Sequence, residues 1–449
     1  MKRVLVVGGG ISGLTTAYLL AGLVDPGGVA IELREADARL GGKLHTTPFA
    51  GLPAVDEGAD AFLARVPDAA DLARALDLDL TSPTGANAAI WHDGMHPIPE
   101  GVLLGVPTDI LRLATTGLLS VRGRLRAAAE PLLPRRSDSD DSIGALIRSR
   151  FGDEVHERLV DALVGSIYAT DTDHASLTMV PQLAALSARG RSLLLNARSM
   201  RAEAPVADGP VFLAPRDGMG ALVDAVASGA SARGVTIRSR ALVSSIAADG
   251  AGWRADDDPF DAVVLATPAA PTAPLLAGAA PDAARLLATM DHAGVVIVTV
   301  AVPEWPDRLA GLSGYLVPKP VQRTVTAASF GSQKWAHWRP EKGEVLRISL
   351  GRDGLPVDDL DDDELVDRAV TEVSEHLGLD LAPTAVRVSR WPGGFPQYRP
   401  HHREWHARVL AALPANLVVT GASYGGIGVP ACVAQAGSAA GQVASLLRG

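Results

Sequence analysis

The sequence predicts an α/β fold whose first element is a strand of a buried parallel sheet. Val4-Leu5-Val6-Val7 is a continuous apolar run, which is typical of a strand covered on both faces. Gly8-Gly9-Gly10-Ile11-Ser12-Gly13 follows directly, and 14–21 is rich in alanine and leucine, as a buried helix would be. A strand, a GxGxxG pattern and a helix, in that order, predict a Rossmann-type dinucleotide-binding unit.

The glycines and the next strand indicate the kind of dinucleotide. Gly8 permits a tight turn, Gly10 lets the backbone approach a pyrophosphate, and Gly13 lets the helix pack on the strand. The N-terminus of that helix offers unpaired N–H groups and a positive dipole end to the phosphates. A second strand, 29–33, leads to Glu35, 22 residues after Gly13 (35 − 13). An acid at this point accepts hydrogen bonds from a ribose and disfavours a 2′-phosphate, which predicts FAD or NAD rather than NADP.

Composition excludes several classes of protein. The chain has 449 residues, enough for two or three domains, and a formal net charge of −10 without a basic run, so nucleic acid is not an expected partner. Cys432 is the only cysteine, which excludes an internal disulfide and a multi-cysteine metal site; we expect a buried thiol and no metal. We expect no signal peptide, since the first strand begins almost at once, and no membrane-spanning helix, since no apolar run reaches about 18 residues. These features predict a cytoplasmic location.

The remaining elements follow in chain order. Helices are expected over 68–76, 117–133, 221–232, 361–377 and 431–447. Two more helices are expected within 142–170, after an acidic segment at 138–141 that suits a helix start. Strands are expected over 235–238, 241–246, 261–267, 294–302, 314–317, 323–330, 344–350 and 417–419. The last strand runs into a glycine-rich turn that begins at Gly421, and this turn directs a second helix N-terminus towards a ligand.

These elements predict three domains. A discontinuous dinucleotide-binding domain comprises 1–60, 208–270 and 405–449, and an antiparallel-sheet substrate domain comprises 61–96 and 271–404. Residues 97–207 form an inserted helical domain. Leu118 and Leu119 lie there close to Arg122, Arg124 and Arg126, so peripheral contact with a membrane is one interpretation and packing against the protein itself is the other.

Several segments resemble known flavoproteins. Glu35-Ala36-Asp37-Ala38-Arg39-Leu40-Gly41-Gly42-Lys43 resembles the ExxxRxGG(K/R) extension of the amine-oxidase-like superfamily, in which the arginine and the glycine pair lie beside the FAD pyrophosphate. This resemblance implies FAD rather than NAD. The chain also resembles the porphyrinogen oxidases of haem biosynthesis over nearly its whole length, because five further segments stand in the same order: 101–107, 166–171, 332–335, 396–398 and 421–430.

The resemblance implies a set of site residues. FAD contacts are expected at Gly8, Gly9, Gly10, Ile11, Ser12, Gly13, Glu35, Ala36, Arg39, Gly42, Lys43, Gly58, Ala59, Asp60, Ala61, Val243, Trp391, Gly421, Ala422, Ile427, Gly428 and Val429. For 58–61 an ordinary polar turn is the alternative. A substrate with carboxylates requires cations, for which we take Arg65, Arg323 and Lys334, with Tyr168 and Thr170 at the wall. No side chain is predicted to act as a catalytic base.

Two departures from the family pattern stand out. Thr170 stands where the family often has glycine, and His401-His402 stand where its proline–glutamine–tyrosine segment usually continues as Gly-His. The approach of the chain near Thr170 is therefore expected to differ. Neither histidine is assigned a role.

The resemblance implies that the chain oxidises coproporphyrinogen III to coproporphyrin III in haem biosynthesis, with dioxygen as acceptor and hydrogen peroxide as product. Protoporphyrinogen IX is an alternative substrate. The FAD motifs are also compatible with an amine oxidase or carotenoid desaturase of the same superfamily, and with a flavoprotein without catalytic activity. Besides substrate and dioxygen, the expected partner is a ferrochelatase in transient contact, and the chain is expected to be a monomer or a homodimer.

Overall fold

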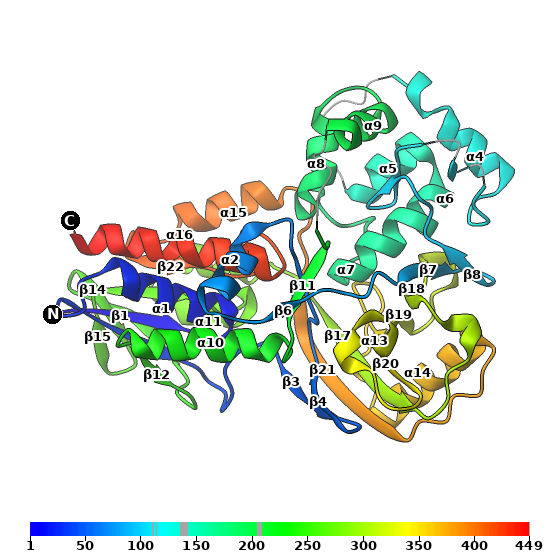
Figure 1. Cartoon of the computed structure of the whole chain (residues 1–449). Coiled ribbons are helices and arrows are strands. Elements are labelled where there is room, and N and C mark those ends of the chain that lie inside the picture. The colour runs from blue at the N-terminus through cyan, green and yellow to red at the C-terminus, as the bar shows by residue number, and fades with distance from the viewer. Residues whose placement is uncertain (110–111, 114, 135–141, 204–208, 449) are drawn as a thin grey trace.

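The computed structural model describes residues 1–109, 112–113, 115–134, 142–203 and 209–448, and the chain forms three parts around their common junction (Figure 1). A parallel-sheet part lies at the left of the figure, an antiparallel-sheet part at the lower right and a helical part at the upper right. The expected helix start at 138–141 lies outside the described residues. Among the described residues, no helix is long and apolar enough to cross a membrane.

The parallel-sheet part is built on five parallel strands in the order β12-β2-β1-β16-β22. Their bounds are Thr236–Arg238, Val29–Arg34, Lys2–Val7, Ala262–Leu265 and Leu417–Val419. Strand β1 is central, as the apolar run predicts. Val4 and Val6 pack into the core on one face of the sheet, and Leu5 and Val7 into the core on the other.

Helices cover both faces of this sheet. One face carries α1 (Ile11–Leu23), α2 (Pro67–Ala75), α10 (Met219–Ala232) and α16 (Val429–Arg448). The other carries α11 (Ala269–Leu276), α12 (Pro281–Leu287) and α15 (His402–Ala411), with the small antiparallel sheet β13-β14-β15 (Ile246–Asp249, Gly252–Ala255, Asp258–Phe260). Helices α2, α11 and α12 therefore pack with the parallel sheet, although the predicted division placed their residues in the substrate domain.

The antiparallel-sheet part is a seven-stranded sheet in the order β21-β17-β20-β19-β18-β7-β8, in which only the β18–β7 pair is parallel. The bounds are Ala385–Pro396, His292–Val302, Glu344–Leu350, Val325–Phe330, Leu312–Leu316, Asn87–Trp91 and Met95–Pro97. Helix α14 (Asp362–Leu377) packs on one face, and the Asp361 side chain caps it by accepting a 2.9 Å bond from Glu364 N. Helix α13 (Gly331–Lys334) follows β19.

Smaller elements connect these parts. A hairpin, β3 (Thr46–Phe49) and β4 (Leu52–Asp56), leads into the loop 57–61, and a three-stranded sheet has the order β5-β11-β6 (Phe62–Leu63, Phe212–Pro215, Leu80–Thr81). Single 3₁₀ turns cover Glu130–Leu132, Leu177–Met179, Asp307–Leu309, Lys319–Val321 and Ala336–Trp338.

The helical part has its own core. It contains α4 (Val121–Ala128), α5 (Ile143–Phe151), α6 (Asp153–Val155), a π-helix (His156–Gly165), α7 (Ser166–Tyr168), α8 (Pro181–Ala188) and α9 (Leu193–Glu203), with the short pair β9 (Val102–Leu103) and β10 (Val106–Pro107). Leu118 and Leu119 are buried in this core. They are therefore not a membrane-facing pair, and the interpretation that they pack against the protein is the one that the structure bears out.

One expected strand is absent. Residues 241–245 have no strand partner, and β13 begins only at Ile246. Ala241 N donates to Glu35 O (2.8 Å) at the end of β2, while Ser244 N and Ser245 N donate to the Asp256 carboxylate (3.0 and 3.1 Å). These bonds hold the segment beyond the end of β2, where it borders a cavity instead of joining a sheet.

Candidate functional site

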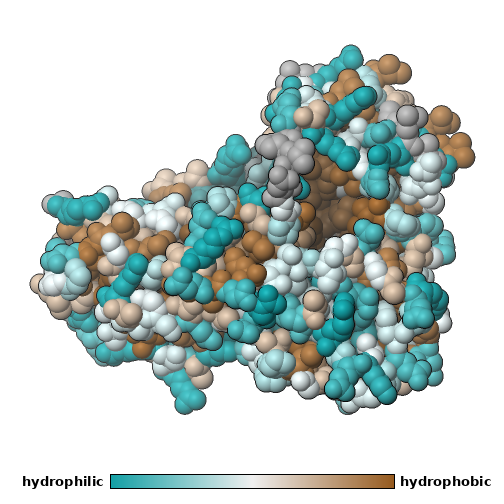
Figure 2. Space-filling view, viewed as in Figure 1, coloured by the Kyte–Doolittle hydropathy of each residue, from teal (hydrophilic) through white to brown (hydrophobic). Residues whose placement is uncertain are grey.

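A cavity of 1510 Å³ lies where the three parts meet. It is larger than the range of about 300–1,000 Å³ that is typical of a site for one small molecule, so it has room for a dinucleotide and a second ligand. Figure 2 shows a hollow lined by apolar residues between the helical part and the rest of the molecule. We call the region bordered by the parallel sheet the cofactor groove, and the region between the helical part and the antiparallel sheet the substrate chamber.

The glycine turn after β1 forms one end of the cofactor groove. Gly8 has φ +103°, a conformation that favours glycine, and its N–H donates to Arg34 O (2.8 Å). A Cβ on Gly13 would lie 1.9 Å from Gly8 O, so this glycine allows α1 to pack on the turn. A Cβ on Gly10 would meet no protein atom within 4 Å, because Gly10 faces the cavity. Gly8 and Gly13 thus have the turn and packing roles that their spacing predicts, and Gly10 leaves its backbone open to the cavity, as the predicted approach of a pyrophosphate requires.

Two charged residues of the predicted FAD motif hold the groove in shape. Glu35 accepts hydrogen bonds from Gly9 N (2.6 Å) and Asp37 N (2.9 Å), and its carboxylate borders the cavity. Arg39 donates to the carbonyls of Leu40, Gly42 and Leu44 (2.9, 2.7 and 3.2 Å). Arg39 does not line the cavity, and neither do Gly9 and Gly13. In place of direct contact with FAD, we therefore assign these three residues a supporting role. The Arg39 guanidinium is used in binding the backbone of its own loop.

The C-terminal glycine turn closes the groove from the other side. Gly421, Gly426 and Gly428 have φ between +106° and +142°, and a Cβ on Gly428 would meet no atom within 4 Å. The Tyr398 hydroxyl donates to Ala422 O (2.6 Å) and accepts from Gly426 N (2.9 Å), which fixes this turn to the strand end after β21. Helix α16 begins directly after Gly428. The N-termini of α1 and α16 therefore both border the cavity.

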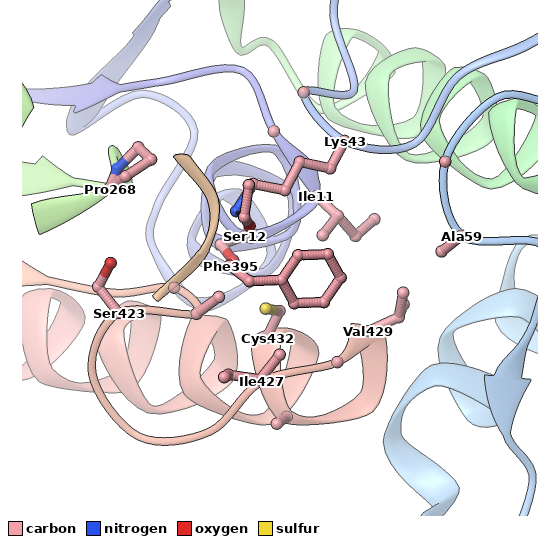
Figure 3. A pocket seen from close by; sticks show the side chains of 18 of the residues that line it. Ile11, Ser12, Lys43, Ala59, Pro268, Phe395, Ser423, Ile427, Val429 and Cys432 are labelled. Carbon is pink, nitrogen blue, oxygen red and sulfur yellow. Dashed lines mark hydrogen bonds between the residues drawn. The ribbon is translucent and has the colours of Figure 1, made fainter. Parts of the chain in front are cut away.

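The residues present fit a bound FAD. Helix α1 has no side-chain cap and no acid in its first turn, so its first N–H groups are free to bind phosphate oxygens. The Lys43 side chain runs past Ser12, and its Nζ donates to Gly394 O (Figure 3). Burial lowers the pKa of Lys43, and within the described part of the chain no carboxylate forms an ion pair with it. An anionic ligand would supply that counter-charge. Gly58 makes a close approach, since a Cβ there would lie 2.2 Å from Lys43 O.

The Cys432 thiol is buried, as predicted, and it also borders the cofactor groove (Figure 3). Burial raises the pKa of this thiol, so it remains protonated at neutral pH and is neither a nucleophile nor a metal ligand. The described residues contain no group of three or more side chains that could hold a metal ion.

Most of the predicted FAD contacts line the cavity. These are Gly8, Gly10, Ile11, Ser12, Glu35, Ala36, Gly42, Lys43, Gly58, Ala59, Asp60, Ala61, Val243, Trp391, Gly421, Ala422, Ile427, Gly428 and Val429. The tertiary structure thus brings together six segments that are separated by up to several hundred residues along the chain. The loop 58–61 forms part of the cavity wall and is not an ordinary surface turn. Trp391 Nε1, on β21 of the antiparallel sheet, donates to Glu57 O (3.0 Å) and so holds the start of this loop over that sheet.

The predicted substrate residues divide into three groups. Tyr168 and Lys334 line the cavity. Thr170 is fully buried but lies behind the wall, where its N–H donates to Gly165 O (3.1 Å). Arg65 and Arg323 do not line the cavity; Arg65 is exposed, and Arg323 pairs with Glu375 on the surface. The structure thus places Arg65 and Arg323 outside the cavity lining, and their role as substrate ligands stays a prediction.

Two arginines of the substrate chamber were not predicted. Arg347 and Arg352 line the cavity and are almost completely buried. Arg352 makes a two-pronged pair with Asp161 of the π-helix (2.8 and 2.9 Å). Burial opposes the ionisation of Asp161, but Arg352 nevertheless holds the pKa of this carboxyl below its usual range. A signal for Arg347 existed in the sequence, since it is a charged residue in the middle of the mostly apolar run 345–350.

Comparisons with known proteins agree with this site. The model of the family "Flavin containing amine oxidoreductase" matches residues 11–444. The coproporphyrinogen III oxidase of Mycobacterium tuberculosis is 35% identical over 446 residues, which cover 97% of this chain and 95% of that protein. The one from Bacillus subtilis is 28% identical and covers 97% and 96%. A crystal structure from Exiguobacterium sp. 255-15, provisionally assigned as a protoporphyrinogen oxidase, has a TM-score of 0.87 at 29% identity and covers 99% of both chains.

Proposed function

The chain belongs to the flavin containing amine oxidoreductase family, and we propose that within this family it oxidises coproporphyrinogen III to coproporphyrin III in haem biosynthesis. The observation that carries this proposal is the similarity to several enzymes of that name, at up to 35% identity over 97% of this chain and 95% of theirs. The size of the cavity, which exceeds the needs of a dinucleotide alone, also supports a large second ligand.

FAD is the cofactor, and when bound it supplies the acceptor for two electrons at a time, in the form of a hydride. The groove residues described above would hold its phosphates at the N-termini of α1 and α16 and its ribose near Glu35. The protein's own contribution to the reaction is to orient the macrocycle and to exclude bulk water. The apolar walls of the chamber, which include Tyr168, Met179 and Ile297, suit the faces of a tetrapyrrole. No side chain is required as a base in this proposal.

The test is direct oxidation of both candidate porphyrinogens in air. The purified protein with its FAD is mixed with coproporphyrinogen III or protoporphyrinogen IX, and the fluorescence of the porphyrin product and the release of peroxide are followed. Faster turnover of coproporphyrinogen III supports the proposal. A preference for protoporphyrinogen IX would instead favour the alternative substrate. No porphyrin from either, with FAD bound, would point to amine or polyene oxidation or to a flavoprotein without catalysis.

We further propose that dioxygen is the electron acceptor and that hydrogen peroxide is formed. Loss of six electrons from the porphyrinogen in two-electron steps requires reoxidation of the flavin between steps. The porphyrin product is a macrocycle into which iron can be inserted, so we include transient contact with a ferrochelatase in the proposal. The protein would act as a monomer or homodimer in the cytoplasm. Any membrane contact would be peripheral and would use Val121 and Leu125, which are exposed on α4 beside Arg122.

A further inference from the structure

A cluster of charged residues lies at the junction of the cofactor groove and the substrate chamber. One oxygen of Asp60, Oδ2, accepts hydrogen bonds from Lys334 Nζ (2.7 Å) and Trp335 Nε1 (3.1 Å), and Arg347 approaches it to 3.2 Å. Arg347 also donates to Gly58 O. We call Asp60, Lys334, Trp335 and Arg347 the Lys334 cluster. Its members come from the loop after β4, from the residues after β19 and from β20, so only the tertiary structure assembles it.

The Lys334 cluster has further charges beside it. Burial alone would raise the pKa of Asp60, but Lys334 and Arg347 hold it well below its usual range, so the carboxylate is ionised at neutral pH. Burial raises the pKa of Asp56 to about 6 and the charge of Arg347 opposes this rise, so Arg347 lies near a second carboxylate. Arg347 is 6% exposed, and its Nε is buried without a hydrogen-bond partner. Arg347 therefore interacts with two carboxylates, whereas Lys334 shares Asp60 alone, so Lys334 is the cation of the cluster that would bind an additional anion.

Lys334 is the member that can reach such an anion. Its side chain keeps 24% of its surface accessible and borders the cavity, and one of its three N–H donors is used for Asp60. Arg347, with 7% of its side chain accessible, is held between Asp60 and Gly58. Trp335 is completely buried. The geometry therefore separates a residue with free donors from residues that position it.

Arg352, a further cation of the substrate chamber, lacks this property. Arg352 is matched by Asp161, which is itself fully buried and also accepts a 2.6 Å bond from the Thr172 hydroxyl. That pair is neutral as a whole, so an added carboxylate would have to compete with Asp161. Lys43 belongs to the cofactor groove, where its side chain lies beside Ser12 (Figure 3).

We propose that Lys334 binds a carboxylate of the bound substrate, and that Asp60 and Arg347 are positioning residues that direct the Lys334 ammonium into the chamber. This inference rests on the proposed function, which supplies a substrate with four carboxylates. The carboxylate forms a charge-assisted hydrogen bond with Nζ. Lys334 thereby favours macrocycles that carry an acidic side chain at the matching corner.

The experiment compares Lys334→Met and Lys334→Arg with the wild-type holoenzyme. The probes are coproporphyrin III, which is stable in air, and its tetramethyl ester, which has the same ring without the charges; binding is read from the quenching of their fluorescence. We expect Lys334→Met to weaken coproporphyrin III about tenfold and the ester less than twofold. Lys334→Arg, which keeps the charge, should recover part of the loss. With coproporphyrinogen III, KM should rise about tenfold while kcat changes less than twofold.

The matched control is Lys342→Met, which removes an exposed lysine that does not line the cavity. Flavin absorbance and the midpoint potential of the bound flavin are measured in every variant. Unchanged binding of coproporphyrin III by Lys334→Met, or an equal loss for the ester, would overturn the proposal. So would a shifted flavin potential with unchanged porphyrin binding, since the cluster would then act on the cofactor. If the wild type binds coproporphyrin III through Lys334 but oxidises no porphyrinogen, only the proposed reaction fails.

Discussion

Gly10 and Gly13 lie three residues apart in one motif, yet the structure predicts opposite consequences for the same substitution. In Gly10→Ala the new Cβ enters the cavity and meets no protein atom within 4 Å, and the residue has φ −72°, which alanine adopts without strain. Reduced freedom of the unfolded chain should stabilise the apoprotein by about 0.4–1 kcal/mol, and the poorer helix cap should cost a similar amount. The free energy of unfolding should therefore stay within about 1 kcal/mol of the wild type.

The same methyl group occupies the space through which a pyrophosphate would approach the backbone. We expect Gly10→Ala to weaken FAD binding at least about tenfold, which corresponds to about 1.4 kcal/mol. In Gly13→Ala the Cβ would lie 1.9 Å from Gly8 O and 3.1 Å from the Ala266 Cβ, so backbone must move. Overpacking of this kind costs about 1–3 kcal/mol of stability even without FAD.

Two measurements separate the effects. Urea unfolding of the apoprotein gives the stability of each variant, and titration with FAD, followed by quenching of flavin fluorescence, gives the affinity. If Gly10→Ala binds FAD within twofold of the wild type, the cavity face of Gly10 is not where the pyrophosphate lies. If the Gly13→Ala apoprotein is as stable as the wild-type apoprotein, the role of Gly13 in helix packing is contradicted.

Two further perturbations test buried charges. Asp161→Asn removes one partner of a fully buried pair and leaves the Arg352 guanidinium without its counter-charge, so urea unfolding should show a loss of about 3–5 kcal/mol. His402 donates from Nε2 to Tyr424 O (3.0 Å), and burial lowers its pKa to about 4. Between pH 6.5 and about 4 the unfolded chain therefore binds the proton and the folded chain does not, so acidification destabilises the protein. The difference between the unfolded and the folded pKa corresponds to about 3 kcal/mol of unfolding free energy. In His402→Gln, the loss of stability on acidification should be smaller by this amount.

The Asp161→Asn and His402→Gln experiments each have a control. Arg323→Gln breaks an exposed pair with Glu375 and should cost less than about 1 kcal/mol, so an equal loss in both variants would mean that burial does not decide the effect. Above pH 7, the free energy of unfolding of His402→Gln should depend on pH in the same way as that of the wild type. An unchanged slope between pH 6.5 and 4 would show that other histidines account for the acid sensitivity.

The nucleotide-binding end of the molecule could be predicted from the sequence because its determinants are local. The strand, the turn at Gly8 and the packing at Gly13 depend on residues within a few positions of one another, and so does the Asp361 cap of α14. The strand expected over 241–246 is absent because its apolar pattern fits a strand but its hydrogen bonds go to Glu35, far away in the chain, and to the Asp256 side chain. A pattern indicates that a segment is extended and partly buried, not which partner it finds.

The sequence by itself determined the class of fold, the cofactor motif and the ligand-facing glycine turns. The tertiary structure decided which charges face the cavity. Arg323 and Lys334 are equally plausible as carboxylate ligands in the sequence, but one pairs with Glu375 on the surface and the other borders the chamber. Arg39 matches a cofactor motif, yet it binds the backbone of its own loop. The reason is physical: a long cationic side chain interacts with whatever carboxylate or carbonyl the folded chain brings near it, and for Arg323 and Lys334 those partners are distant in sequence.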